Sequence, residues 1–377
     1  MSSDNKPTDK NSADAKQSAD SSSVPQTAAE SSDAEPTAAE KRRARVNSLL
    51  SLLLAGIVGY IATSVWMPGD TYRDNLPPLT DGQKALSANL KKHVETLAAG
   101  IGERNSAHYD KLKEAESYVE ESFKAAGFKP EEIKSQNFEV NGRAFRNIEV
   151  ELPGTRRAAE ILIIGAHFDT APNTPGADDN GSGTAALLEL ARIFRNKKFE
   201  RTIRLVAFTN EEPPYFFKPA MGSYHYAERS RKLNENIVGM MSLETIGTYK
   251  YEMGSQHYPV RGGSWFYPSR GNFIGFISTQ ASGPFVRECV GTFRRLVKFP
   301  CEGLAAPAFV IAVQLSDHWC FEKFGYQSLM VTDTAPFRID TYHQPSDKPD
   351  TLQYDDMARV VDGLARTISE LARKADN

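Results

Sequence analysis

The sequence contains little cysteine and tryptophan and no large excess of either charge. Its 377 residues include three cysteines and three tryptophans, and the formal net charge is −3. A near-neutral chain gives no sign of the basic surface that nucleic acid attracts, so we expect no nucleic-acid partner. Cys289, Cys301 and Cys320 form no CxxC pair of the kind found in structural zinc sites. In an exported domain they could form one disulfide and leave one thiol, with Cys289 and Cys301 the closest pair in sequence.

Aromatic residues are absent from the first 44 residues, which also contain only one valine. Such a segment cannot bury enough apolar surface to offset the entropy of ordering its backbone. We therefore predict that residues 1–46 form a disordered cytoplasmic tail, a simple tether that ends in a basic flank.

Charged residues are also absent from the segment between Asn47 and Trp66, which is predominantly apolar. At 1.5 Å per residue, this run of about 20 residues spans about 30 Å, the thickness of the hydrocarbon core of a bilayer. Lysine and arginine residues lie just before it, at 41–43 and 45, and the positive-inside rule places that end in the cytoplasm. We predict a single-pass transmembrane anchor over 47–66, with the rest of the chain periplasmic or extracellular.

Two other interpretations of the apolar run are a buried helix of a soluble protein and a cleaved signal peptide. The basic flank and the polar leader favour an anchor over a buried helix. The length of the run, and of the segment before it, favours an anchor that is not cleaved.

The remaining chain predicts a linker over residues 67–80 and one α/β domain over residues 81–377, because no repeat or second linker interrupts it. Helices are predicted over residues 82–98, 110–127, 182–196, 282–297 and 353–373. Strands are predicted over residues 136–140, 145–152, 160–166, 202–208, 237–243, 272–278 and 327–333. Continuous apolar strands that alternate with helices favour a mixed, mostly parallel central sheet flanked by helices.

Polar residues follow several of these strands directly, where ligands bind in sheets of this kind. Two imidazoles and three carboxylates stand out as zinc ligands by their chemistry: His167, Asp179, Glu212, Glu244 and His343. Asp179 lies beside Asp178 in a glycine-rich turn, PGADDNGSG, where two adjacent negative charges repel. A carboxylate that bridges two cations resolves that repulsion. Each residue alone has an ordinary structural explanation, but their coincidence at several strand ends favours one shared site.

Five motifs together resemble the M28 family of zinc-dependent exopeptidases. They are AHFDT (166–170), PGADDNGSG (175–183), TNEEPP (209–214), SLETIG (242–247) and YHQPSDKPDTL (342–352). The similarity runs in order from residue 90 to residue 372. The resemblance implies a single α/β domain that holds two zinc ions.

Carried over residue by residue, the resemblance implies a complete set of ligands. One zinc ion would be bound by His167 and Glu244, the other by Glu212 and His343, and both by the bridging Asp179. At the position of Glu244 the best-known members have aspartate, and the extra methylene puts the geometry and occupancy of that metal in question.

The resemblance also implies the residues around the metals. Asp169 and Asp178 would lie behind the ligands, with Asp169 orienting the ring of His167. Glu211 would be the general base that takes a proton from a zinc-activated water and passes it to the leaving amine. Tyr342 would donate a hydrogen bond to the developing oxyanion. The family often has a cis peptide at the position that matches Asp178–Asp179.

The function predicted from these features is that of a membrane-anchored zinc aminopeptidase acting on peptides. A glutaminyl-cyclase-like acyltransferase uses a similar fold but a single zinc ion. An exopeptidase that recognises a carboxylate would need a basic pocket, for which Arg261, Arg270 and Arg338 are available. A catalytically silent binding domain would be expected to lose ligands or the base. Separately, the stretch SDHWCFEKFG (316–325), which contains Asp317 and His318, has two interpretations: an approach to the cleft, and the favoured one, the start of a packed helix capped by Ser316.

Overall fold

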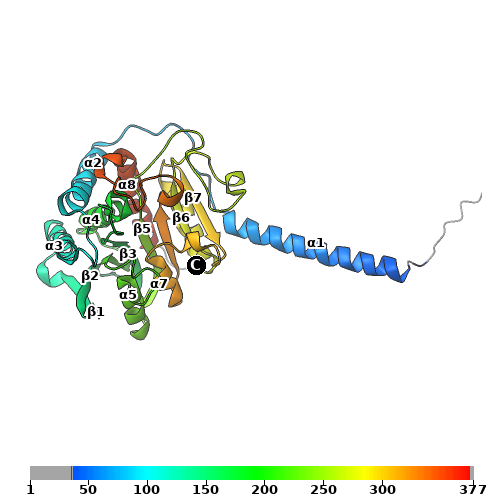
Figure 1. Cartoon of the computed structure of the whole chain (residues 1–377), viewed down its shortest axis with the longest axis horizontal. Helices are drawn as coiled ribbons and strands as arrows, with labels where there is room; N and C mark the ends of the chain where they lie inside the picture. Colours follow the sequence, from blue (N-terminus) through cyan, green and yellow to red (C-terminus); the bar gives the residue numbers. More distant parts are fainter. Residues whose placement is uncertain (1–34, 36, 374–377) are drawn as a thin grey trace, which may run out of the picture. The chain divides into compact units, whose positions relative to one another are not determined.

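The centre of the domain is a sheet of eight strands in the order β1-β2-β4-β3-β5-β8-β6-β7 (Figure 1). The computed structural model describes residues 35 and 37–373. Within them the strands are β1 (Ile133–Val140), β2 (Arg143–Leu152), β3 (Arg157–His167), β4 (Arg201–Phe208), β5 (Asn236–Glu244), β6 (Ile274–Thr279), β7 (Cys301–Ala306) and β8 (Ser328–Thr332).

The four inner strands β4, β3, β5 and β8 run parallel to one another. At one side β2 pairs antiparallel with β4 and with β1, and at the other side β6 pairs antiparallel with β8 and parallel with β7. This arrangement confirms the predicted mixed α/β sheet. Because the inner strands are parallel, their carboxyl ends meet at one edge of the sheet.

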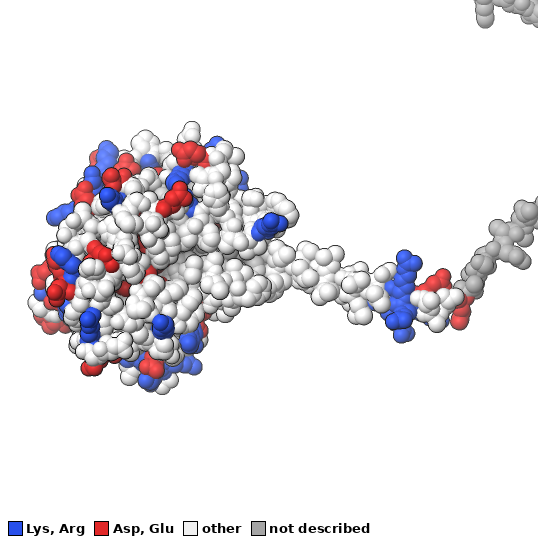
Figure 2. Space-filling model, in the orientation of Figure 1, with Lys and Arg blue, Asp and Glu red and all other residues white. Residues whose placement is uncertain are grey.

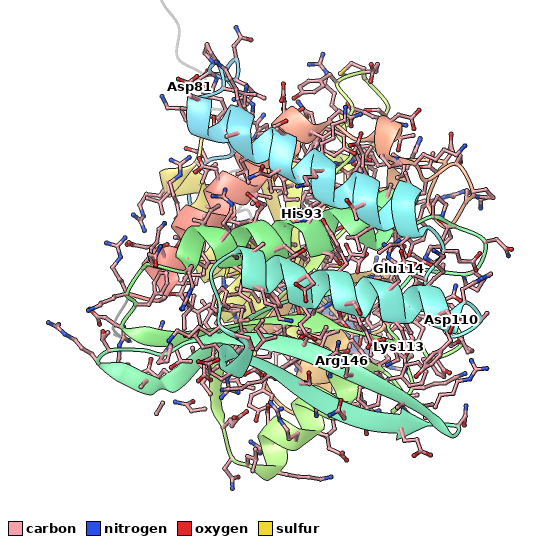
Figure 3. The ribbon with its side chains drawn as sticks, turned by 90° about the vertical axis from the view of Figure 1, so that its left-hand side faces the viewer. Asp81, His93, Asp110, Lys113, Glu114 and Arg146 are labelled. Carbon is pink, nitrogen blue, oxygen red and sulfur yellow. The ribbon has the colours of Figure 1, made fainter. Side chains whose placement is uncertain are left out.

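Helices cover both faces of the sheet. On one face lie α2 (Asp81–Val94), α3 (Tyr109–Ala125), α4 (Gly183–Phe194), α6 (Gly283–Leu296) and α8 (Tyr354–Leu371), and on the other lie α5 (Gly222–Lys232) and α7 (His318–Lys323). Figure 3 shows α2, α4 and α3 side by side. In the same view Lys113 of α3 lies near Arg146 of β2, and both form ion pairs with the buried Glu116.

The strand sequence explains the two layers. Successive side chains of a strand point to opposite faces. In β3, Leu162 and Ile164 pack into the larger core below α2, α3, α4, α6 and α8, whereas Ile161 and Ile163 pack with α5 and α7. A strand that is apolar at every position is therefore buried on both sides.

The first helix, α1 (Ala38–Val65), includes most of the predicted anchor. By length and composition it is the one described helix that could cross a membrane. It begins before Asn47, because the alanine, glutamate, lysine and arginine residues of the basic flank are good helix formers. The rest of the predicted tail, residues 1–34 and 36, lies outside the described residues. The chain consists of two compact units, with the boundary between Ala55 and Gly56. The last turns of α1 belong to the second unit, Gly56–Asn377.

Among the described helices and strands, α5 and β7 were not predicted, whereas α7 follows the helix start that was predicted at Ser316. Apart from α1, which begins nine residues before the predicted anchor, the boundaries of the others agree to within a few residues. The three cysteines are buried thiols. The disulfide that the sequence left open, with Cys289 and Cys301 as the closest pair, is not formed, and both side chains lie in the apolar core.

We expect an Ellman titration of the folded chain in detergent to detect no rapidly reacting thiol. Burial raises the pKa of both Cys301 and Cys320, so neither forms the reactive thiolate readily. Unfolding in guanidinium without reductant should expose three thiols. A single thiol after unfolding would show that a disulfide had formed.

Candidate metal centre

The candidate ligands come from the carboxyl ends of neighbouring parallel strands. His167 is the last residue of β3 and Glu244 the last residue of β5, while Glu211 and Glu212 follow the end of β4. All four side chains are almost completely buried. Asp179 reaches the same place from the turn between β3 and α4. The sheet topology thus brings together residues that lie far apart in the sequence.

One group of ligand atoms gathers around His167. Its Nε2 lies 3.1 Å from Oε2 of Glu244 and 3.9 Å from Oε2 of Glu211. The ligand atoms of these three residues lie within 4.8 Å of one another, close enough to share a cation.

A second group gathers around His343, from the loop between β8 and α8. The Nε2 atom of His343 lies 2.9 Å from Oδ2 of Asp179 and 3.3 Å from Oε1 of Glu212. Yet His343 Nε2, Asp179 Oδ1 and Glu212 Oε1 are buried and have no aligned hydrogen-bond partner among the described residues. Buried polar atoms without partners are rare. Imidazole nitrogen and carboxylate oxygen that converge in this way fit the donor set of zinc.

Asp179 lies between the two groups. Its Oδ1 is 3.5 Å from Nε2 of His167, and its Oδ2 faces His343. One carboxylate thus directs its two oxygens at two imidazoles. This geometry would let each oxygen bind a different cation.

The charges of the site perturb its titration. Burial, reinforced by the charge of Asp179, raises the pKa of Glu212 to about 7. Burial also raises the pKa of Glu211 well above its ordinary value, and His167 only partly opposes it. Burial alone would lower the pKa of His343, but its contacts with Asp179 and Glu212 raise that pKa to about 10. The site is therefore a cluster of anions that attracts protons or other cations.

Asp169 holds the loop that follows β4. Its two carboxylate oxygens accept hydrogen bonds from the backbone N–H groups of Glu211 and Glu212, both at 3.1 Å. Its Oδ1 lies 3.6 Å from Nδ1 of His167, which is nearer to the backbone oxygen of Asp169, at 3.2 Å. Asp169 therefore fixes the position of two acidic residues and also lies behind the imidazole.

Asp178 points away from its neighbour Asp179. Its carboxylate accepts hydrogen bonds from the backbone of Gly247 and from the hydroxyl of Thr248. The backbone N–H groups of Asp178 and Asp179 donate to the carboxylate of Asp347. The cis peptide lies between Asp179 and Asn180, one residue after the position that the resemblance implied.

The turn that carries Asp179 is held by an arginine that sequence reasoning missed. Arg104 is fully buried, and burial lowers its pKa to about 10 although Asp169 and other anions oppose that change. Its guanidinium donates to the backbone carbonyls of Leu97, Gly102, Phe168, Pro175 and Gly176. The cation therefore ties the segment after β3 to the turn beyond it and lies beneath the acidic cluster.

Ser316 contacts the site and does not cap a helix as predicted. Its hydroxyl donates to Oε2 of Glu244 at 2.8 Å and lies 2.7 Å from the hydroxyl of Ser242. The N-cap position of α7 is occupied by Asp317, without a side-chain capping bond. Ser316 thus orients the longer carboxylate that stands at the unusual position of the ligand set.

Asp317 is a further buried acid near the site, as the less favoured interpretation of its stretch expected. Neither of its carboxylate oxygens has a hydrogen-bond partner among the described residues. Burial raises its pKa to about 7, with His167 opposing and Glu244 adding to the shift. It adds a further potential negative charge behind the first group of ligands.

Tyr342 lies beside the second group. Its ring stacks on that of His343, with centroids 4.0 Å apart and planes at 16°. Burial and the nearby carboxylates raise the pKa of its hydroxyl well above the ordinary value. The side chain therefore stays protonated at neutral pH and can donate a hydrogen bond.

The chain is similar to known proteins in sequence and in fold. A family model described as peptidase family M28 matches residues 147–368. YfbL, an uncharacterized protein of Escherichia coli (strain K12), is 34% identical over 288 residues, which are 74% of this chain and 87% of that protein. Among solved structures, BSAP, a zinc aminopeptidase from Bacillus subtilis, has a TM-score of 0.61 at 16% identity and covers 77% of this chain and 95% of its own.

A second solved structure with a similar fold is that of an enzyme with a different name and reaction, a glutaminyl cyclase. A glutaminyl cyclase from Fimbriiglobus ruber has a TM-score of 0.56 at 19% identity, covering 79% of this chain and 97% of its own. At these identities the structural matches show the fold alone. The choice between reactions depends on the site itself.

We expect Ser316→Ala to weaken zinc binding by about 10- to 100-fold, the usual effect of losing a residue that orients a ligand. Competition with a chelating dye measures the affinity. Ser316→Thr keeps a hydroxyl and should recover most of it, and Ser369→Ala on α8 is the matched control. Equal affinity in Ser316→Ala and the wild type would show that the contact with Glu244 is irrelevant to the metal.

We expect the metal-free chain to lose stability as pH rises from about 4 to about 7. Glu212 and Asp317, each with a folded pKa of about 7, keep a proton that the unfolded chain has already released. The folded state thus binds more protons in this window, and the free energy of unfolding falls. Thermal unfolding in detergent measures it, and Asp317→Asn should flatten the slope. Stability that rises with pH across this window would contradict the assignment.

Proposed function

Because the chain belongs to peptidase family M28, we propose that it is a two-zinc exopeptidase, and more specifically an aminopeptidase. The observation that carries the proposal is the placement of Asp179 between two groups of zinc-type ligands. A single carboxylate with both oxygens directed at different imidazoles supports a pair of ions. BSAP, which has a similar fold, is a zinc aminopeptidase.

The proposed ligand set uses every side chain of the two groups except Glu211. His167 and Glu244 would hold one ion, Glu212 and His343 the other, and Asp179 both. When bound, the zinc ions supply Lewis-acid chemistry, which acidifies water and polarises a carbonyl oxygen.

Glu211 is the proposed proton carrier. Its carboxylate lies beside the ligand groups, and the bond from its backbone N–H to Asp169 holds it there. As general base it takes the proton of the attacking water, and as general acid it delivers that proton to the amine of the departing peptide. Burial, reinforced by the neighbouring anions, raises the pKa of Glu211, which helps the carboxylate to hold the proton that it takes up.

Tyr342 is the proposed donor to the oxyanion. Its hydroxyl keeps its proton at neutral pH, and its stacking on His343 places the ring against a proposed ligand. Such a preorganised donor stabilises negative charge that develops in the transition state.

We further propose that α1 anchors the chain in a membrane with its basic end in the cytoplasm and the peptidase domain outside. The lysine and arginine residues at 41–43 and 45 support this orientation. The substrate would then be a peptide outside the cytoplasm.

The alternative activities fit the site less well. A cyclase with one zinc ion leaves the partnerless atoms of the second group unexplained. A carboxylate-binding pocket built on Arg338 is disfavoured, because its guanidinium already donates to Gln256, Thr248 and Phe273. A silent domain has no reason to keep Glu211 beside a full ligand set.

We expect Glu211→Gln to lower kcat for aminoacyl-anilides by about 10²- to 10⁴-fold, the usual value of a general base. Its zinc content should stay at two ions per chain, since Glu211 is not a proposed ligand. Mass spectrometry of the metal and steady-state hydrolysis measure the two effects, and Glu131→Gln on the surface is the matched control.

Three outcomes would contradict the proposal. Loss of one zinc ion in Glu211→Gln would make Glu211 a ligand. One ion or none in the wild type, with no hydrolysis in zinc-supplemented buffer, would exclude the two-zinc peptidase. Cyclisation of a peptide with N-terminal glutamine, without hydrolysis, would identify a cyclase.

A further inference from the structure

An apolar cavity leads away from the candidate metal centre. Its volume is about 430 Å³, and Glu244, Thr245 and Tyr342 line one part of it. That volume is typical of a pocket for a small ligand or a few side chains. Another part is lined by Ile61 and Val65, in the last two turns of α1. The cavity therefore connects the site to the end of the helix that we propose as a membrane anchor.

Two exposed loops form the rim of this cavity, and we call them the rim loops: residues 257–267 and 306–313. Trp265 is 85% exposed and Phe309 is 83% exposed, far beyond what an aromatic side chain normally shows to water. Val260, Phe266 and Ile311 are exposed as well. The second loop contains no polar or charged side chain at all, and the first contains one charge, Arg261. An apolar patch of this kind marks an interaction surface.

The end of α1 is fastened to the domain beside the rim loops. Gln280 donates to the hydroxyl of Ser64 at 2.7 Å, and Arg287 donates to the carbonyl of Thr63. Beyond the helix, Arg294 donates to the carbonyl of Gly69 at 2.8 Å. These bonds hold the last turns of the helix against α6 and the turn before it, and the same turns line the cavity together with residues of the rim loops.

With α1 anchored as proposed above, the rim lies at the depth of lipid. If the predicted span ends at Trp66, Ile61 lies about 7.5 Å inside it along the helix axis, at 1.5 Å per residue. Interfacial elements bury their apolar faces about 5–10 Å into the boundary between headgroups and acyl chains. The wall that contains Ile61 is therefore level with that boundary. Figure 2 agrees, because charged side chains gather around α2, α3 and β1 and are sparse on the visible surface near β6 and β7.

We propose that the rim loops dock into the outer surface of the same bilayer that α1 crosses, so that the cavity opens toward lipid. This rests on the membrane anchoring proposed above, and it does not require the zinc chemistry. Trp265 and Phe309 insert at the interface, where tryptophan is enriched in membrane proteins, and Arg261 contacts lipid phosphate. The apolar end of a peptide that partitions into the membrane surface then has a direct route to the site.

The test uses the three tryptophans of the full chain, Trp66, Trp265 and Trp319. Three variants each keep one of them and replace the other two by phenylalanine. Each is placed in nanodiscs of phosphatidylcholine with or without brominated acyl chains, which quench tryptophan only within the lipid. Iodide is the aqueous quencher. Trp66 reports whether the helix is inserted, Trp265 reports docking, and Trp319, packed on Phe217, is the control.

We expect Trp265 to lose about as much emission in brominated lipid as Trp66 does, several times the loss of Trp319, and to be shielded from iodide. Quenching of Trp66 alone, with Trp265 open to iodide, would overturn docking and leave the anchor intact. No quenching of Trp66 would overturn both. Hydrolysis of a soluble aminoacyl-anilide by the same three samples reports the proposed activity separately, so failure of the peptidase proposal cannot be mistaken for failure of docking.

Discussion

Negative charge concentrated out of reach of water is the constraint on which the rest of this structure depends. Glu211, Glu212, Glu244 and Asp179 meet in a space where each is nearly fully buried. Burying an isolated carboxylate is very costly, so such groups either take up protons or bind cations. The raised pKa values of the glutamates describe the first response, and the proposed zinc ions would supply the second. The fold must hold these groups together in either case.

A second set of acidic residues provides that hold. Asp169 accepts the backbone N–H groups of the loop after β4, and Asp347 accepts those of the turn that carries Asp179. Asp178 does the same for the segment after β5. Each of these carboxylates accepts hydrogen bonds from the backbone of a segment that carries, or directly follows, a candidate ligand. Arg104 supplies the balancing charge, and its bonds to several carbonyls fix the same turn from below.

The sequence was sufficient to predict the mixed sheet and the strand ends that carry the candidate ligands, because continuous apolar strands and the polar residues after them are local patterns. It was not sufficient for Ser316, Arg104 or Asp347. Ser316 lies in the loop between β7 and α7, does not directly follow a strand, and bonds to Glu244 at the end of β5, which is far away in the sequence. Arg104 lies between elements, where a buried arginine has no local signature. The cysteine pairing failed for the same reason, since proximity in sequence says little about which residues share a core.

The edge of the sheet connects the site to the proposed anchor. β7 is an edge strand, and an edge with unpaired backbone groups is a liability unless something covers it. Here the chain that follows α1 satisfies one of these groups, because the N–H of Cys301 donates to the hydroxyl of Thr71. Arg294 joins the carbonyl of the same cysteine to the carbonyl of Gly69. The segment that leaves the helix is thus bonded to the edge of the sheet whose inner strands carry the candidate ligands. A helix attached by a flexible linker would leave the orientation of the domain open. The predicted linker over residues 67–80 is bonded to α6 at Gly69 and to β7 at Thr71, so the orientation of the cavity relative to the end of the helix is part of the fold.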